Sequence, residues 1–200
     1  MASDGLVEGA EEKLRAYAEL LETYALPLGL LAPGDADRIW ERHVLDSLRA
    51  LPCLTVNDRA LVDLGSGAGL PGIPVAIARP QADVFLVEPM RRRAAFLELA
   101  VERLKLGNAH VRIQEARSVR EDADVVLARA LRGAREVWSM ASPILRPGGR
   151  VLYFAGGTWE IREAATVSEG GATVSICSPP LHPWQGPVVM MTRADTSGTG

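Results

Sequence analysis

The chain has 200 residues, of which 48% are hydrophobic and 24% are charged, a composition typical of a globular protein with one sizeable core. No apolar stretch reaches the roughly 20 residues that cross a bilayer, and residues 1–5 do not resemble a secretory signal, so we expect a cytoplasmic protein without a membrane span. The net charge of −3 argues against non-specific coating of nucleic acid, although arginine clusters could still form a local basic surface.

The two cysteines, Cys53 and Cys177, lie far apart in the sequence, with no Cys-x-x-Cys spacing and no neighbouring histidine ligand. We interpret both as small buried apolar groups. We therefore expect neither a metal site nor a disulfide. We also expect a monomer.

Two helices are expected before the first strand. In residues 11–26 apolar side chains recur every three or four positions, which predicts an amphipathic helix. Asp35 or Asp37 can cap a second helix that runs to about Ala50. We interpret residues 1–56 as a helical extension.

After this extension, short apolar runs alternate with helical stretches, which is typical of a mostly parallel sheet with helices on both faces. The expected strands cover residues 60–64, 83–88, 109–114, 124–128, 149–155, 172–177 and 187–192. The expected helices cover residues 72–79, 91–106, 133–145 and 159–169. A short, proline-rich loop joins the last two strands, so we expect an antiparallel hairpin at the sheet edge. The domain is expected to span residues 57–193, with a disordered tail at 194–200.

The most informative stretch runs from Leu61 to Pro74, where an apolar strand leads into Asp63 and a series of glycines. Glycines allow positive φ and let a ligand lie against the bare main chain. Residues 67–72 fit the dinucleotide fingerprint Gly-x-Gly-x-x-Gly only loosely, whereas an acid before alternating glycines resembles the loop of class I S-adenosylmethionine (SAM) methyltransferases. Glu88 ends the next expected strand, where an acid can bind ribose hydroxyls. These features predict a nucleoside cofactor and favour SAM over nicotinamide.

Four segments together resemble one family. They are Arg42-His43-Val44-Leu45-Asp46-Ser47, the loop from Asp63 to Pro74, Glu88 with Arg91-Arg92-Arg93, and Asp124 leading to Ala128-Arg129-Ala130. The chain is thus similar, over residues 38–157, to the glucose-inhibited division protein B family, the bacterial small-subunit rRNA (guanine-N7) methyltransferases. The resemblance implies a class I SAM-dependent methyltransferase with a Rossmann-like α/β fold and, as partner, 16S rRNA or the small ribosomal subunit. The alternatives are a related methyltransferase acting on another RNA or a small molecule, and a SAM-binding ribosome-associated protein with weak activity.

The resemblance also implies a set of site residues. Those expected to contact SAM are Asp63, Gly65, Ser66, Gly67, Gly69, Leu70, Glu88, Pro89, Met90, Ala116, Arg117 and Arg129. Those expected to contact the RNA are Arg42, His43, Asp46, Arg92 and Arg93. Arg129, at the tip of the fourth strand, is the expected catalytic residue, because ligands of open α/β sheets bind beyond the carboxyl ends of the strands. Guanine N7 presents a lone pair without a proton, so no general base is expected.

Structural roles compete for several of these side chains. Arg129 could pair with Asp63 or Glu88 as an ordinary strand-end arginine. His43 and Asp46 stand three residues apart on one expected helix, so they could meet on one face and tie that helix to the SAM loop.

Arg38, Arg42 and Arg49 recur at intervals of four and seven on the same helix and predict a basic face. This face could contact the RNA backbone, although a solvated helix face is its ordinary role. The chain departs from the family pattern at Arg117, where an acid is usual, and at Gly156, where a lysine is usual.

Overall fold

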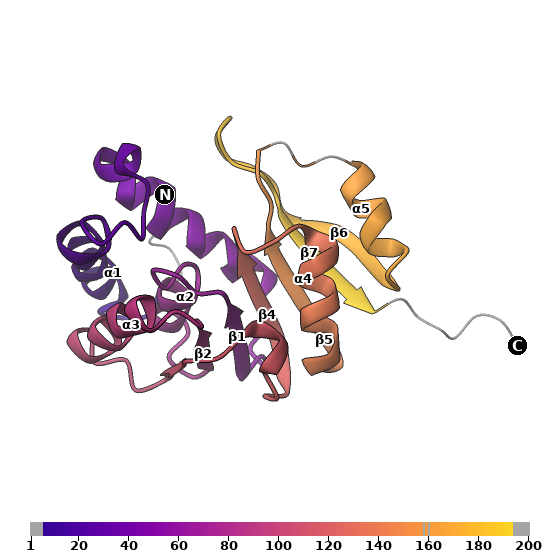
Figure 1. Cartoon of the computed structure of the whole chain (residues 1–200), viewed down its shortest axis with the longest axis horizontal. Helices are drawn as coiled ribbons and strands as arrows, with labels where there is room; N and C mark the ends of the chain where they lie inside the picture. Colours follow the sequence, from indigo (N-terminus) through magenta and orange to yellow (C-terminus); the bar gives the residue numbers. More distant parts are fainter. Residues whose placement is uncertain (1–5, 158, 160, 194–200) are drawn as a thin grey trace, which may run out of the picture.

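The computed structural model describes residues 6–157, 159 and 161–193, so the predicted tail at 194–200 lies outside the described residues. Seven strands form one sheet in the order β3-β2-β1-β4-β5-β7-β6 (Figure 1). They are β1 (Ala60–Leu64), β2 (Asp83–Val87), β3 (Ala109–Arg112), β4 (Ala123–Arg129), β5 (Leu145–Phe154), β6 (Ala172–Ser178) and β7 (Val188–Arg193). Strands β1 to β5 run parallel, and β7 is antiparallel to both β5 and β6. The predicted sheet with an antiparallel edge hairpin is confirmed, and β6 is the edge strand.

Within the described part of the chain, five α-helices accompany the sheet: α1 (Ala10–Leu20), α2 (Gly72–Ala78), α3 (Arg91–Arg103), α4 (Ala134–Ala141) and α5 (Ile161–Ser168). Shorter turns of 3-10 or π-helix are η1 (Leu21–Ala25), η2 (Pro33–Arg38), η3 (Trp40–Leu45), η4 (Leu48–Cys53), η5 (Ala116–Ser118) and η6 (Ser142–Ile144). The predicted second helix is confirmed as one continuous helical segment, although its hydrogen-bond pattern changes from 3-10 in η2 to π in η3 and back to 3-10 in η4. Pro33 begins the first of these and Pro52 lies inside the last, where it cannot donate a backbone hydrogen bond.

Alternating side chains on the strands pack against two helical layers. In β1, Leu61 belongs to the core shared with α1, α2 and α3, whereas Val62 belongs to the core shared with α4 and α5. Figure 1 shows α1 to α3 and α4 with α5 at opposite sides of the sheet. Tyr17 of α1 is fully buried in the first core, so the N-terminal helices share the core of α2 and α3.

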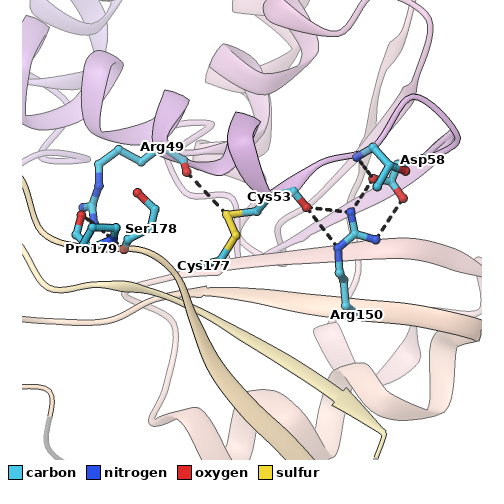
Figure 2. Close-up of a disulfide and its surroundings, with 8 residues drawn as sticks. Arg49, Cys53, Asp58, Arg150, Cys177, Ser178 and Pro179 are labelled. Atoms are coloured by element: carbon cyan, nitrogen blue, oxygen red, sulfur yellow. Dashed lines mark hydrogen bonds and ion pairs between the residues drawn. A yellow bond between two sulfur atoms is a disulfide. The ribbon is translucent and has the colours of Figure 1, made fainter.

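A disulfide joins Cys53 and Cys177, with 5.9 Å between their Cα atoms (Figure 2). The prediction of two separate, unpaired cysteines is therefore wrong. The two residues are 124 positions apart in the sequence, but η4 packs against β6 and brings them together. Sequence spacing could not reveal this contact, because it depends on the strand order at the far edge of the sheet.

Candidate functional site

The glycine loop follows β1 and is anchored to β2. The backbone N–H groups of Gly65 and Ser66 donate to the carbonyl oxygen of Val87, at 2.9 and 3.0 Å. Gly65, Gly67 and Gly69 all have positive φ (69°, 58° and 90°), a conformation that side chains disfavour. The loop is thus a preformed concave stretch of backbone at the carboxyl end of the sheet.

Asp63 is the acid that precedes these glycines, and it is completely buried. Its Oδ2 accepts hydrogen bonds from Ser66 Oγ (2.7 Å) and from the Gly72 backbone N–H (3.1 Å), which fixes the loop to the start of α2. Its Oδ1 has no hydrogen-bond partner among the described residues. Burial raises the pKa of Asp63 to about 7, while the hydrogen bonds from Ser66 and Gly72 oppose this shift.

Glu88 directly follows β2 and is 2% exposed. Its Oε2 accepts a hydrogen bond from the Gly67 N–H (3.0 Å), and its Oε1 accepts one from the Met90 N–H (2.9 Å). Arg93 lies 3.9 Å from Oε2 and has a partly exposed side chain. A fixed carboxylate beside the glycine loop can accept hydrogen bonds from ribose hydroxyls, and the contact of Glu88 with the ribose stays a prediction.

A cavity of about 280 Å³ lies over the glycine loop, and we name it the cofactor cavity. Its lining comprises Leu30, Leu31, Ala32, Asp35, His43, Gly65, Ser66, Gly67, Ala68, Leu70, Arg93, Arg129 and Ala130. Bare backbone, apolar side chains and a buried carboxylate with an unpaired oxygen behind the loop suit a nucleoside ligand that carries positive charge. The chemistry of SAM, a sulfonium and an ammonium joined to a nucleoside, fits this set of residues.

Arg129 ends β4 beside this cavity. Its Nη2 lies 3.1 Å from Asp46 Oδ2 and donates to the Arg42 carbonyl oxygen at 2.8 Å. The structure does not show the alternative pairing of Arg129 with Asp63 or Glu88. Its partner is Asp46, the residue that directly follows η3. Burial lowers the pKa of Arg129, and the neighbouring Asp46 carboxylate opposes this shift.

A second cavity of about 290 Å³ also borders Arg129, and we name it the acceptor cavity. Its lining comprises Arg42, Asp46, Arg49, Arg129, Ala130, Tyr153, Phe154, Ala155, Gly156, Gly157, Trp184, Gln185 and Gly186. Arg129 and Ala130 line both cavities. Arg129 is therefore placed to act between a ligand in one cavity and a ligand in the other.

Asp46 is the centre of a buried polar network at the acceptor cavity. Its Oδ1 accepts hydrogen bonds from Arg49 Nη1 (2.7 Å) and Gln185 Nε2 (2.9 Å). Arg49 is only 7% exposed, so its predicted place on a basic solvent-facing helix is wrong. The Arg49 side chain points inwards, where the Asp46 carboxylate at 2.7 Å neutralises its charge.

His43 and Asp46 do not meet in the way that their spacing suggested. His43 Nε2 lies 3.0 Å from Oδ2 of Asp35, and burial lowers the pKa of His43. Oδ1 of the same aspartate lies 3.2 Å from Arg42 Nε. His43 therefore borders the cofactor cavity and Asp46 the acceptor cavity, with Arg129 between them.

The other predicted residues lie further out. Pro89, Met90, Arg92 and Arg117 are exposed, and Ala116 is partly buried in η5. None of the five borders the two cavities. An adenine that extends from the glycine loop past Glu88 would still approach η5, so their predicted contacts with SAM or RNA stay predictions.

Sequence reasoning missed three groups that build the site. The β6–β7 loop supplies one wall of the acceptor cavity through Trp184, Gln185 and Gly186. Arg49 was assigned to the surface. Tyr17, interpreted only as an apolar position, donates its hydroxyl proton to the Ala68 carbonyl oxygen at 2.6 Å and supports the glycine loop from behind. The burial of a tyrosine on an apolar face was the only signal for this last contact.

The described residues also bear on metal-binding clusters and on helices that could cross a membrane. Across the described ranges, no cluster of three or more histidine, cysteine or acidic side chains could hold a metal ion. No described helix combines the length and the hydropathy that a bilayer crossing needs.

Comparison with known sequences places the chain among rRNA methyltransferases. A family model described as rRNA small subunit methyltransferase G matches residues 10–172. A relative named ribosomal RNA small subunit methyltransferase G, from Mycobacterium marinum, is 41% identical over 197 residues that cover 94% of this chain and 86% of the relative. Another with the same name, from Mycolicibacterium gilvum, is 44% identical over 146 residues that cover 71% of this chain and 64% of the relative. The matched part thus spans slightly less than two thirds of that second protein.

Comparison with solved structures confirms the predicted class I methyltransferase fold. Fibrillarin from Aeropyrum pernix, solved in complex with S-adenosyl-L-methionine, aligns with a TM-score of 0.59 and 21% identity, over 76% of this chain and 75% of fibrillarin. The sequence match extends from α1 to the start of β6 and includes every residue of the glycine loop. The chain belongs to the rRNA small subunit methyltransferase G family.

Proposed function

We propose that this chain transfers a methyl group from SAM to N7 of a guanine in small-subunit (16S) rRNA. At the level of the family, the predicted rRNA methyltransferase and its methyl donor are confirmed. The observation that carries the proposal for this chain is the position of Arg129, which lines the cofactor cavity and the acceptor cavity at once.

The cofactor cavity and the acids packed against its glycine loop supply the groups that SAM requires. Glu88 would accept hydrogen bonds from the ribose, Gly65 and Gly67 would face the amino-acid part, and Asp63 would favour its positive charge from behind the loop. When bound, SAM supplies a methyl group on a sulfonium that an uncharged nucleophile can displace. The residues of the chain bind and orient, and none of them needs to move a proton.

The acceptor cavity suits a purine that leaves its stack. Enzymes that modify a base act on a single strand or on a base turned out of its stack, and a cavity walled by Arg129, Tyr153 and Trp184 can receive such a base. Arg129 can donate a hydrogen bond to the guanine carbonyl oxygen, which neighbours N7, and so hold the lone pair towards the methyl group. The ion pair with Asp46 keeps its guanidinium in one orientation.

The rim of the acceptor cavity offers positive charge to the RNA backbone. The guanidinium groups of Arg38 and Arg42 lie 5.0 and 5.8 Å from the centre of the Trp184 ring. The Arg42 side chain is 41% exposed, so its charge can also reach a phosphate. We propose that these two arginines, together with Arg92 and Arg93 at the start of α3, meet the small subunit in the cytoplasm.

Product analysis tests the function. Small subunits that lack the modification are incubated with the protein and SAM, and the digested rRNA is examined by mass spectrometry. We expect one N7-methylguanosine per subunit. The proposed reaction would be rejected if the methyl group were found on another atom. It would also be rejected if the protein bound SAM but transferred no methyl group to the rRNA.

A further inference from the structure

The loop between β6 and β7, residues 179–187, forms one wall of the acceptor cavity. Two side chains from the N-terminal part of the chain, Asp46 and Arg49, hold this loop in place. Arg49 Nη2 donates to the carbonyl oxygens of Ser178 (3.2 Å), Pro179 (3.0 Å) and Gly186 (2.8 Å). Gln185, inside the loop, donates to Asp46. The same aspartate binds Arg129, so the position of the wall and the orientation of Arg129 depend on one network.

The disulfide is the covalent part of this attachment. Cys53 lies one helical turn after Arg49, and its Sγ is 3.8 Å from the Arg49 carbonyl oxygen (Figure 2). Cys177 immediately precedes Ser178, the first of the residues whose carbonyls Arg49 binds. The bond therefore fixes the beginning of the loop beside the arginine that holds it.

The two sulfurs of the bond differ in exposure. Cys177 is partly buried and lies on β6, an edge strand of the sheet. Cys53 is only 6% exposed. An attacking thiolate would therefore approach the sulfur of Cys177 and leave the sulfur of Cys53 as the leaving group.

We propose that the Cys53–Cys177 pair is a reversible redox switch that controls the acceptor cavity through the β6–β7 loop. This inference rests on the proposed function, because a protein that modifies rRNA works among thiols that reduce disulfides, where a disulfide is usually a redox-sensing one. Low-molecular-weight thiols and their disulfides are the reductant and the oxidant.

The exchange balances in two steps. A thiolate bonds to Sγ of Cys177, the bond between the two cysteine sulfurs breaks, and Cys53 leaves with the electron pair and takes a proton. A second thiolate displaces the first from Cys177, which gives two cysteine thiols and one low-molecular-weight disulfide. The reverse sequence, started by such a disulfide, restores the bond.

Reduction changes the loop and leaves the cofactor cavity intact. Without the covalent tie, only non-covalent contacts hold the wall: the hydrogen bonds of Arg49 and Gln185, the bond from the Ala155 N–H to the Pro187 carbonyl, and the packing of Trp184 against Arg38 and Arg42. The wall then opens more often, so a smaller fraction of molecules has a formed acceptor cavity. No residue of the loop lines the cofactor cavity. The oxidised enzyme should thus bind the subunit better, with the same affinity for SAM.

The test compares oxidised wild type, reduced wild type and a double variant, Cys53→Ser with Cys177→Ser, which cannot form the bond. These are the only two cysteines in the sequence, so no other thiol responds to the reagent. We expect reduction to raise KM for small subunits by roughly three- to tenfold, because the apparent KM is the intrinsic KM divided by the fraction of molecules whose wall is closed. The values of kcat and of the Kd for SAM should stay unchanged. The double variant should match the reduced enzyme and ignore the reagent.

Amide hydrogen exchange gives a readout that needs no activity. The N–H groups of Leu181 and His182 donate to Gln185 Oε1, and the Gln185 N–H donates to the His182 carbonyl. Exchange at these three amides should quicken on reduction, while exchange in the glycine loop stays the same. Equal KM values and equal exchange in both redox forms would overturn the switch, as would a bond that glutathione cannot reduce in the folded protein. Faster exchange without methylation in either form would instead reject the proposed function.

Discussion

Asp63 shows at the scale of one residue how the fold prepares a site for a cation. The carboxyl group is fully buried, and its Oδ1 has no hydrogen-bond partner among the described residues. Burial raises its pKa to about 7, so near neutral pH a large fraction of molecules carries a proton there. A positively charged ligand at the loop favours the ionised carboxylate and lowers this pKa.

This coupling predicts a pH dependence of SAM binding. Below pH 7 the ligand must displace the proton of Asp63, whereas above pH 7 the carboxylate is already ionised. If only the ionised form binds, the Kd measured by calorimetry should be roughly tenfold lower at pH 8 than at pH 6. The Asp63→Asn variant is the control, since the amino group of SAM titrates equally in both proteins. A wild-type pH profile identical to that of the variant would show that Asp63 does not titrate with binding.

Tyr17 carries a second prediction at this scale. Its buried hydroxyl donates to the Ala68 carbonyl at 2.6 Å, so Tyr17→Phe leaves that oxygen without its donor. The free energy of unfolding, measured with urea, should fall by about 1–3 kcal/mol, and SAM should bind more weakly. Tyr24→Phe is a matched control from the same region, because Tyr24 is 38% exposed. An equal loss of unfolding free energy and of SAM affinity in the two variants would show that the Tyr17 hydroxyl does not support the glycine loop.

At the scale of elements, the glycine loop depends on backbone conformation. Gly65 has φ of 69°, and a Cβ atom there would lie 2.5 Å from Leu131 Cδ1. Gly65→Val should abolish SAM binding in calorimetry, since it adds strain and fills the space over the loop. Gly148→Ala is the control, because Gly148 has a similar φ of 78° but no atom within 4 Å of the added Cβ. It should lose some stability and keep its affinity for SAM. Normal SAM binding by Gly65→Val would mean that the cofactor lies elsewhere.

Elements with strong local signals were predictable from the sequence, and those shaped by distant contacts were not. Every strand from β1 to β7 was expected within a few residues, because apolar runs separated by turn residues encode them locally. The changes of helix type at η2, η3 and η4 and the contact between η4 and β6 depend on tertiary packing. The disulfide was missed for the same reason.

At the scale of the molecule, the cofactor side of the candidate site was predictable from the sequence, whereas the acceptor side was not. Asp63, the glycines and Glu88 lie within one βαβ unit, so their spacing predicted the cofactor side. The acceptor side joins Asp46 to Gln185 and Arg49 to Gly186, pairs that are 139 and 137 positions apart. Arg129 was identified from its place at a strand end, whereas its ion pair with Asp46 required the three-dimensional arrangement.

The overall charge predicts how the substrate is recognised. A net charge of −3 gives little general attraction for RNA, so binding should depend on the arginines around the acceptor cavity meeting a structured particle. Methylation of small subunits should fall steeply as salt rises, and a short naked RNA with the same target sequence should be a much poorer substrate. Equal initial rates on the subunit and on a random oligonucleotide would contradict this form of recognition.

The central claim is that Arg129 holds the acceptor base between the two cavities, and the turnover of Arg129→Ala on small subunits tests it most directly. The fold should survive, because Asp46 keeps Arg49 at 2.7 Å and Gln185 at 2.9 Å as partners. We expect turnover to fall roughly 10- to 1000-fold, the usual effect of losing one positioned donor. Arg103→Ala, which removes an exposed arginine from the end of α3, should behave like the wild type. A folded Arg129→Ala protein that methylates rRNA at the unmodified rate would contradict the account.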